Sequence, residues 1–130
     1  MQYILPFDIW QEIILKCEFI DAIHLRQLNK WFYKLEIHDF YNIDDKYICK
    51  LTNDILIAYP FIRKLNAYNG RITNINHLTN LKVLYVDWNG GISDNGINKL
   101  TNLKELSYLY NNRLKNFECK PTLLIYGFNI

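Results

Sequence analysis

The stretch LTNLKVLYVDWNGG, residues 78–91, is followed by a near copy, LTNLKELSYLYNNR, at residues 100–113. The two segments align without a gap, 22 residues apart, and both carry the pattern LxxLxLxxN, in which L stands for an apolar residue. A weaker copy lies 19 residues before the first, with Ile62, Leu65, Ala67 and Gly70 in the four slots. A chain that repeats one motif at a spacing of about 20 residues is predicted to stack repeated structural units.

Each copy of the motif predicts a short strand with one buried face. Alternating apolar positions point to one side of a strand, and a terminal Asn can bond backbone groups where the chain turns. One copy cannot bury its apolar face, whereas stacked copies cover one another as a solenoid.

The connecting segments repeat too, because residues 51–65 align without gaps on residues 92–106. Both open with a hydroxyl residue and an Asp/Asn pair before an apolar run, which predicts a short helix. The equivalent segment at residues 72–84 is two residues shorter, which favours a tighter 3₁₀-like turn.

Residues 49–114 resemble the leucine-rich repeat family on these motifs. Cys49, Thr52 and Pro60 occupy slots typical of its cysteine-containing subtype. Asp44 and Lys46 fall in the apolar slots of a strand before Cys49, so the first repeat is predicted to be only a convex half. Residues 115–130 leave the period, and their apolar run after a proline predicts either a last strand that covers the open end or an interrupted repeat series.

Residues 5–35 have a different pattern. Apolar residues recur at helical spacing, with a break near residues 18–21, and predict two or three short helices. This stretch resembles the F-box family without a gap, although Cys17 and Ala22 stand where the family generally has Leu. The matching residues are Leu5, Pro6, Asp8, Ile9, Trp10, Ile13, Ile14, Asp21, Ile23, Leu25, Leu28, Lys30 and Phe32. The resemblance implies docking on a Skp-family adaptor of a cullin-type ubiquitin ligase. The residues predicted to contact that adaptor are Leu5, Pro6, Ile9, Trp10, Ile13, Leu28, Trp31 and Phe32.

The tandem of an F-box and leucine-rich repeats implies an α+β protein that selects a substrate protein for ubiquitination and performs no chemistry itself. The predicted parts are a helical F-box-like domain at residues 1–40, a connecting segment with the first convex half-repeat at 41–60, and repeats with a C-terminal cap at 61–130. An alternative is an interaction module outside any ligase, in which the N-terminal helices only cap the solenoid. Burial of Leu5, Pro6 and Ile9 against residues 51–65 would favour the cap, and an exposed apolar patch there would favour docking.

Positions between the apolar slots should form columns on the concave face of the sheet. Aromatic residues dominate these columns, and such residues are enriched at binding hot spots. The predicted substrate contacts are Tyr68, Tyr85, Asp87, Trp88 and Tyr110. The alternative is that these rings pack on each other as structural ladders in a Tyr-rich chain.

Composition argues against several other classes. The 15 basic and 13 acidic residues of this 130-residue chain are interspersed, so no basic stripe for nucleic acid stands out. Cys17, Cys49 and Cys119 are widely spaced without a CxxC motif, which favours reduced thiols and no metal site. No enzyme motif or cofactor-binding loop is present.

Asp8 and Glu12 argue against a secretory signal, and no apolar run could span a membrane. We therefore expect an intracellular protein, in the cytoplasm or nucleus of a eukaryotic or infected host cell.

Overall fold

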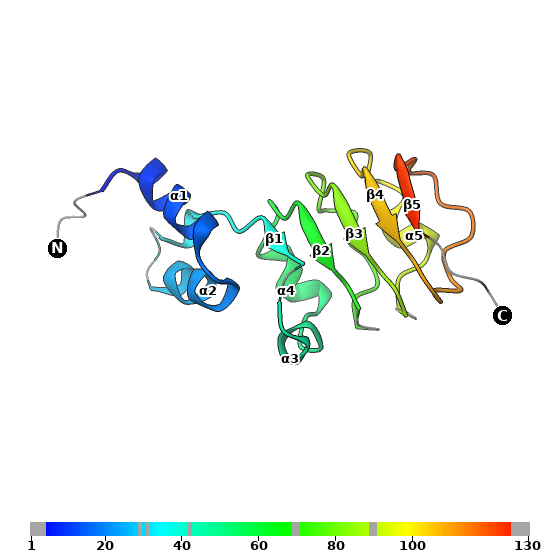
Figure 1. The fold of residues 1–130 in the computed structure, drawn as a ribbon, viewed down its shortest axis with the longest axis horizontal. Helices are drawn as coiled ribbons and strands as arrows, with labels where there is room; N and C mark the ends of the chain where they lie inside the picture. The colour runs from blue at the N-terminus through cyan, green and yellow to red at the C-terminus, as the bar shows by residue number, and fades with distance from the viewer. Residues whose placement is uncertain are drawn as a thin grey trace.

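The structure is a computed structural model that describes residues 5–28, 30, 32–41, 43–68, 71–88 and 91–125. Two helices lie at one end of an elongated chain, and the strands follow in a row (Figure 1). The elements are α1 (Phe7–Lys16), α2 (Phe19–Gln27), the 3₁₀ helix η1 (Phe32–Lys34), β1 (Asp39–Phe40), α3 (Asp45–Ile48), α4 (Asn53–Ile57), β2 (Lys64–Asn66), β3 (Val83–Tyr85), α5 (Asp94–Ile97), β4 (Glu105–Ser107) and β5 (Leu123–Ile125). The predicted α+β class is confirmed.

The strands form one parallel sheet in the order β1-β2-β3-β4-β5. Its register places Leu65, Leu84 and Leu106, one from each predicted repeat, directly opposite one another. All three side chains are fully buried. The sequence period therefore corresponds to the strand-to-strand step, and the arrangement is consistent with a small leucine-rich-repeat-like sheet.

The segments between the strands follow the sequence pattern closely. The predicted short helices are α4 and α5, and the Thr52 hydroxyl caps α4 by accepting a hydrogen bond from the Ile55 backbone N–H. The shorter segment at residues 72–84 has no helix in this structure. Two i→i+3 hydrogen bonds shape it instead, each 3.0 Å long, from Leu78 N to Ile75 O and from Leu81 N to Leu78 O. A tight turn thus replaces the helix, as its length predicts.

The first repeat differs from the prediction, because it has a strand of its own. β1 pairs with β2, and Phe40 lies opposite Leu65. Ile37 and Phe40 are buried and fill the first two apolar slots of the motif, whereas Asp44 directly precedes α3. The strand therefore begins several residues before the expected position. Sequence reasoning missed it because β1 has only two residues and its apolar slots hold Ile and Phe instead of Leu.

The last strand is present but is not well covered. β5 pairs with β4 and places Leu124 opposite Leu106, so the structure has a last strand, one of the two alternatives that the sequence left open. The side chain of Leu124 is 39% exposed, whereas Leu106 is fully buried. β5 therefore extends the sheet while leaving this end of the core partly open.

Polar side chains tie neighbouring repeats together. Asn111, in the last slot of the motif, is buried and donates to the carbonyls of Val86 and Ile92 in the preceding repeat. On the convex side, Asn53 donates to the Thr73 hydroxyl at 2.8 Å and accepts from the Thr73 backbone N–H at 2.9 Å. Three of these bonds satisfy backbone groups, the carbonyls of Val86 and Ile92 and the N–H of Thr73. The Asn role predicted from the motif is confirmed at Asn111, and Asn89 lies outside the described residues.

Gly96 in α5 lies where the backbones of two repeats approach closely. A Cβ atom added there would lie 2.3 Å from the Thr73 carbonyl oxygen, and the Gly96 carbonyl accepts a hydrogen bond from Ile75 N. We expect Gly96→Ala to lower the free energy of unfolding by about 1–3 kcal/mol, because backbone must shift to make room. Urea denaturation measures the change. Asn95→Ala is the control, since Asn95 is exposed on the same helix; equal losses would contradict the close approach.

Candidate protein-interaction surfaces

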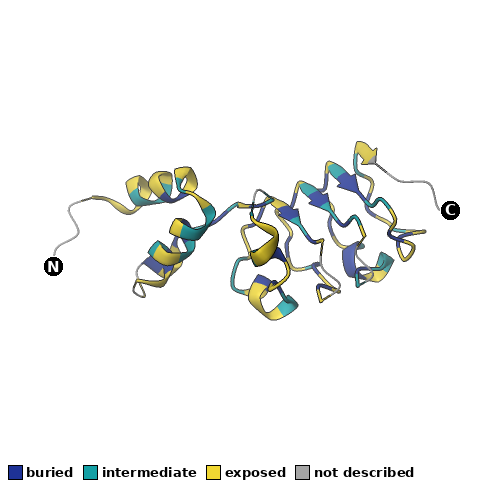
Figure 2. Cartoon of the chain, turned by 60° about the horizontal axis from the view of Figure 1, so that its bottom comes forward, coloured by how far each residue is buried: buried dark blue, intermediate teal, exposed yellow. Residues whose placement is uncertain are grey.

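Helix α1 carries an apolar stripe that faces away from the rest of the protein. Leu5, just before the helix, and Ile9 and Ile13 within it are 38%, 40% and 36% exposed. Residues four apart lie on one face of a helix, so these side chains form a continuous row, called here the outer stripe. Figure 2 likewise shows that most residues of α1 are exposed. Pro6 at the N-cap is also exposed, and so is Leu28 at the end of α2.

A second apolar stripe of α1 is used internally. Ile14 is buried, and Trp10 and Cys17 pack against the core. The Trp10 ring meets the Phe32 ring edge-on, with centroids 5.1 Å apart. Phe32 is only 5% exposed, so Trp10 and Phe32, both predicted to contact an adaptor, act as packing residues in this structure. Trp31 lies outside the described residues.

Arg26 joins the helices to the first repeat. Its side chain is buried, and it donates to the carbonyls of Tyr33 and Leu35 and, at 2.7 Å, to that of Ala58 beyond α4. The guanidinium lies between two aromatic rings, 4.4 Å from the centroid of Tyr33 and 4.3 Å from that of Tyr59. A planar group with five donors can serve several carbonyls and stack on rings at the same time.

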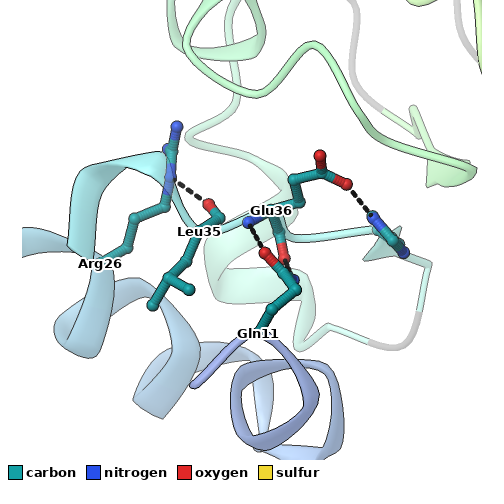
Figure 3. Close-up of polar contacts among 5 residues, drawn as sticks. Gln11, Arg26, Leu35 and Glu36 are labelled. Carbon is teal, nitrogen blue, oxygen red and sulfur yellow. Dashed lines mark hydrogen bonds and ion pairs between the residues drawn. The ribbon is translucent and has the colours of Figure 1, made fainter. Parts of the chain in front are cut away.

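Gln11 adds a second connection, from α1 to the segment that leads into β1. Its amide donates to the Glu36 carbonyl at 2.9 Å and accepts from the Glu36 backbone N–H at 2.7 Å. Figure 3 shows this pair beside the bond between Arg26 and Leu35. The faces of α1 and α2 that carry Gln11 and Arg26 are therefore turned toward the rest of the protein. The outer stripe of α1 is held away from the repeats.

The concave face of the sheet carries a row of paired rings and carboxylates. Tyr41 follows β1 directly, and its ring lies 4.6 Å from that of Tyr85 on β3. The Tyr85 hydroxyl donates to the Glu105 carboxylate on β4. This hydrogen bond, together with burial, raises the pKa of the Tyr85 phenol above its ordinary value. Sequence reasoning missed Tyr41 because it did not place β1.

Two of the predicted substrate residues lie next to the ends of strands and differ in their roles. Asp87 accepts hydrogen bonds from the Ser107 hydroxyl and from Leu109 N, both at 2.7 Å, so its carboxylate ties two repeats together. Tyr68 is 52% exposed, and its backbone N–H donates to Asn66. Tyr68 is therefore available to a partner, whereas Asp87 already has internal partners.

Trp88 and Tyr110 form a stacked pair on the surface. They occupy equivalent positions in successive repeats, and both have φ of 56°. Their ring centroids are 4.0 Å apart and the planes differ by 24°, yet the residues are 62% and 50% exposed. The left-handed conformation is strained for aromatic residues, and such strain often marks functional positions. The two rings stack on each other, as the ladder alternative predicts, and both remain exposed; their contact with a substrate stays a prediction.

The acidic, histidine and cysteine side chains in the described part of the chain are not gathered into a metal site. None of its residues form a group of three or more His, Cys, Asp or Glu side chains that could hold a metal ion. Cys119 is buried, and burial raises the pKa of its thiol. Within these same residues no helix has the length and apolar character needed to cross a membrane.

The fold and its surfaces define a small repeat protein with a helical N-terminal region. Comparison with protein-family models, with curated proteins and with solved structures found no match for the chain.

Proposed function

We propose that this chain is the substrate-recognition subunit of a cullin-type ubiquitin ligase. In this proposal α1, α2 and η1 form an F-box that docks a Skp-family adaptor, and the sheet forms leucine-rich repeats that hold a target protein. The observation that carries the proposal is the outer stripe of α1, formed by Leu5, Ile9 and Ile13. The outer stripe coincides with residues that carry the F-box resemblance.

A helix that only covers a core needs one apolar stripe. α1 has two, and Trp10, Ile14 and Cys17 already supply the inward one. Exposed apolar rows that serve no internal packing are typical of surfaces that bind another protein. An amphipathic helix laid into an apolar groove of a partner would cover the outer stripe without disturbing the inner one.

The alternative, in which the helices only cap the solenoid, accounts for α2 better than for α1. Phe19 of α2 packs on Phe40 of β1 with centroids 4.9 Å apart, and Arg26 reaches Ala58. These contacts cover the first strand. They leave Leu5, Pro6 and Ile9 exposed and not buried against residues 51–65. Capping and docking thus use different faces of the same helical region, which supports the ligase-receptor proposal.

Co-purification with a Skp-family adaptor tests the proposal. We expect the unchanged chain to be retained and the double variant Ile9→Ser, Ile13→Ser to bind at least about tenfold more weakly. Burial of two isoleucine side chains at an interface contributes about 2 kcal/mol or more beyond their present burial. Leu5→Ala, Pro6→Ala should weaken binding in the same direction.

The matched control is Ile55→Ser, Ile57→Ser on α4, because these isoleucines are 40% and 61% exposed on a different helix. The control should retain the adaptor, and circular dichroism melting should show that all variants fold. A folded unchanged chain that fails to retain the adaptor contradicts the proposal, and so does equal loss in the control.

A further inference from the structure

We propose that the edge of the sheet at which the strands begin binds an extended acidic segment of a target protein, and that Arg63, Lys82 and Lys104 recognise its carboxylates. This inference names the substrate class for the proposed receptor function and in that respect rests on it. The three residues, called here the cation column, are dispersed in the sequence, 19 and 22 residues apart. Only the stacking of the repeats brings them into one row, which is why the chain shows no basic stripe when it is read in order.

The backbone register establishes the cation column directly. Each of the three residues immediately precedes a strand, namely β2, β3 and β4. Lys82 N donates to Arg63 O, and Lys104 N donates to Lys82 O, both at 2.8 Å. Neighbouring strands lie about 4.8 Å apart, so the cation column spans about 10 Å along the edge of the sheet at which the strands begin. Lys64, on β2 beside Arg63, adds a fourth exposed cation.

The side chains of the cation column are exposed and have no ion-pair partner among the described residues. Like charges on neighbouring strands repel each other. An anionic partner would relieve this repulsion.

The carboxylates of the neighbouring concave face are already engaged. Asp39 accepts a hydrogen bond from Tyr41 N at 2.7 Å, and Glu105 accepts from the Tyr85 hydroxyl. Asp87 accepts from Ser107 and Leu109. Each of these acids thus has a hydrogen-bond donor within the protein, whereas the side chains of the cation column have no ion-pair partner among the described residues. Charge complementarity therefore favours an acidic occupant at this edge.

The concave face next to the cation column favours a peptide over a nucleic acid. The Tyr41–Tyr85 ring pair begins three residues, or about 10 Å, along the strands from the cation column. Acidic side chains of an extended peptide can reach the column while neighbouring apolar side chains lie on the rings. A phosphate backbone has charge at every nucleotide and would also meet Asp39, Glu105 and Asp87. The exposed rings of Tyr68, Trp88 and Tyr110 extend the apolar contact surface beyond the strands.

Fluorescence polarisation with a labelled random Glu–Tyr copolymer peptide tests the inference on the full chain. We expect binding that weakens as salt rises, no binding of a Lys–Tyr copolymer, and at least a tenfold loss of Glu–Tyr affinity in the variant Lys82→Glu, Lys104→Glu. The matched control is Lys99→Glu, Lys120→Glu, which changes net charge equally at exposed positions outside the cation column. The control should stay within about threefold of the unchanged chain.

Three results would overturn the inference: absence of Glu–Tyr binding by the folded chain, equal loss in both charge variants, or tighter binding of a labelled oligo-dT strand than of the Glu–Tyr peptide. Adaptor co-purification of the same variants separates this inference from the proposed function. The cation column is on the sheet and not on α1, so both charge variants should retain the adaptor. Peptide binding without adaptor binding would leave the inference standing and the ligase proposal overturned.

Discussion

Replacement of Arg26 by Met is expected to lower the free energy of unfolding by about 3 kcal/mol. The substitution removes the donor from three backbone carbonyls, those of Tyr33, Leu35 and Ala58, and a buried acceptor left without a donor costs about 1–3 kcal/mol. It also removes the stacking of the guanidinium on Tyr33 and Tyr59. Relief from burying a charge offsets part of this loss, which is why the expected value is below the sum. Urea denaturation followed by circular dichroism measures it.

Two further substitutions sharpen the Arg26 experiment. Arg26→Lys keeps the charge but replaces a planar fork with a single ammonium group, so we expect an intermediate loss of about 1–2 kcal/mol. Arg113→Met removes an exposed arginine and should change stability by less than about 0.5 kcal/mol. An Arg26→Met midpoint equal to that of Arg113→Met would show that the bridge between the helices and the repeats contributes nothing.

The same variant has a consequence for the coupling of the two regions. One buried apolar cluster runs from Ile14 and Ala22 in the helices to Leu114 and Cys119 at the far end of the sheet. Arg26 adds the polar connection across the helix–repeat junction. Its loss should therefore raise amide hydrogen exchange in α2 and near Ala58 before it does so in β3 and β4. In the unchanged protein the helices and repeats should unfold together.

The repeats could be predicted from the sequence because their apolar period is also their packing period. Leu65, Leu84 and Leu106 stand in register in the structure as in the aligned motifs. Prediction failed where the period is carried by other residue types. Ile37 and Phe40 fill apolar slots without any leucine, so β1 and the adjoining Tyr41 were not identified.

The candidate surfaces were harder to predict, because the direction in which a side chain points matters more than which residue it belongs to. Trp10 and Ile9 are neighbours in the F-box resemblance, yet Trp10 packs inward and Ile9 faces outward. Arg26 gave no signal in the sequence, since a basic residue on a short helix normally lies in solvent. The cation column is recognised only when the repeats are aligned and the residues that follow the first apolar position of the motif are compared. Reading the sequence in order does not reveal it.

Replacement of Leu84 by Ala is expected to lower the free energy of unfolding by about 3 kcal/mol. Leu84 is fully buried in β3, between Leu65 on one neighbouring strand and Leu106 on the other. Removal of its methyl groups loses transfer free energy and leaves a cavity, which together cost about 2–5 kcal/mol for a buried leucine. In a stacked array each repeat supports both neighbours, so β2 and β4 lose contacts at the same time.

Leu124→Ala provides a control at the same motif position. Leu124 in β5 lies opposite Leu106 but is 39% exposed. It therefore has less apolar contact to lose and would leave a smaller cavity. We expect a loss below about 1 kcal/mol, by the scaling of free energy with buried apolar area. The motif alone would assign the two leucines the same importance, whereas the structure assigns most of it to Leu84. Equal shifts of the urea midpoint would mean that β5 is covered as well as β3, which would contradict the partly open end of the core.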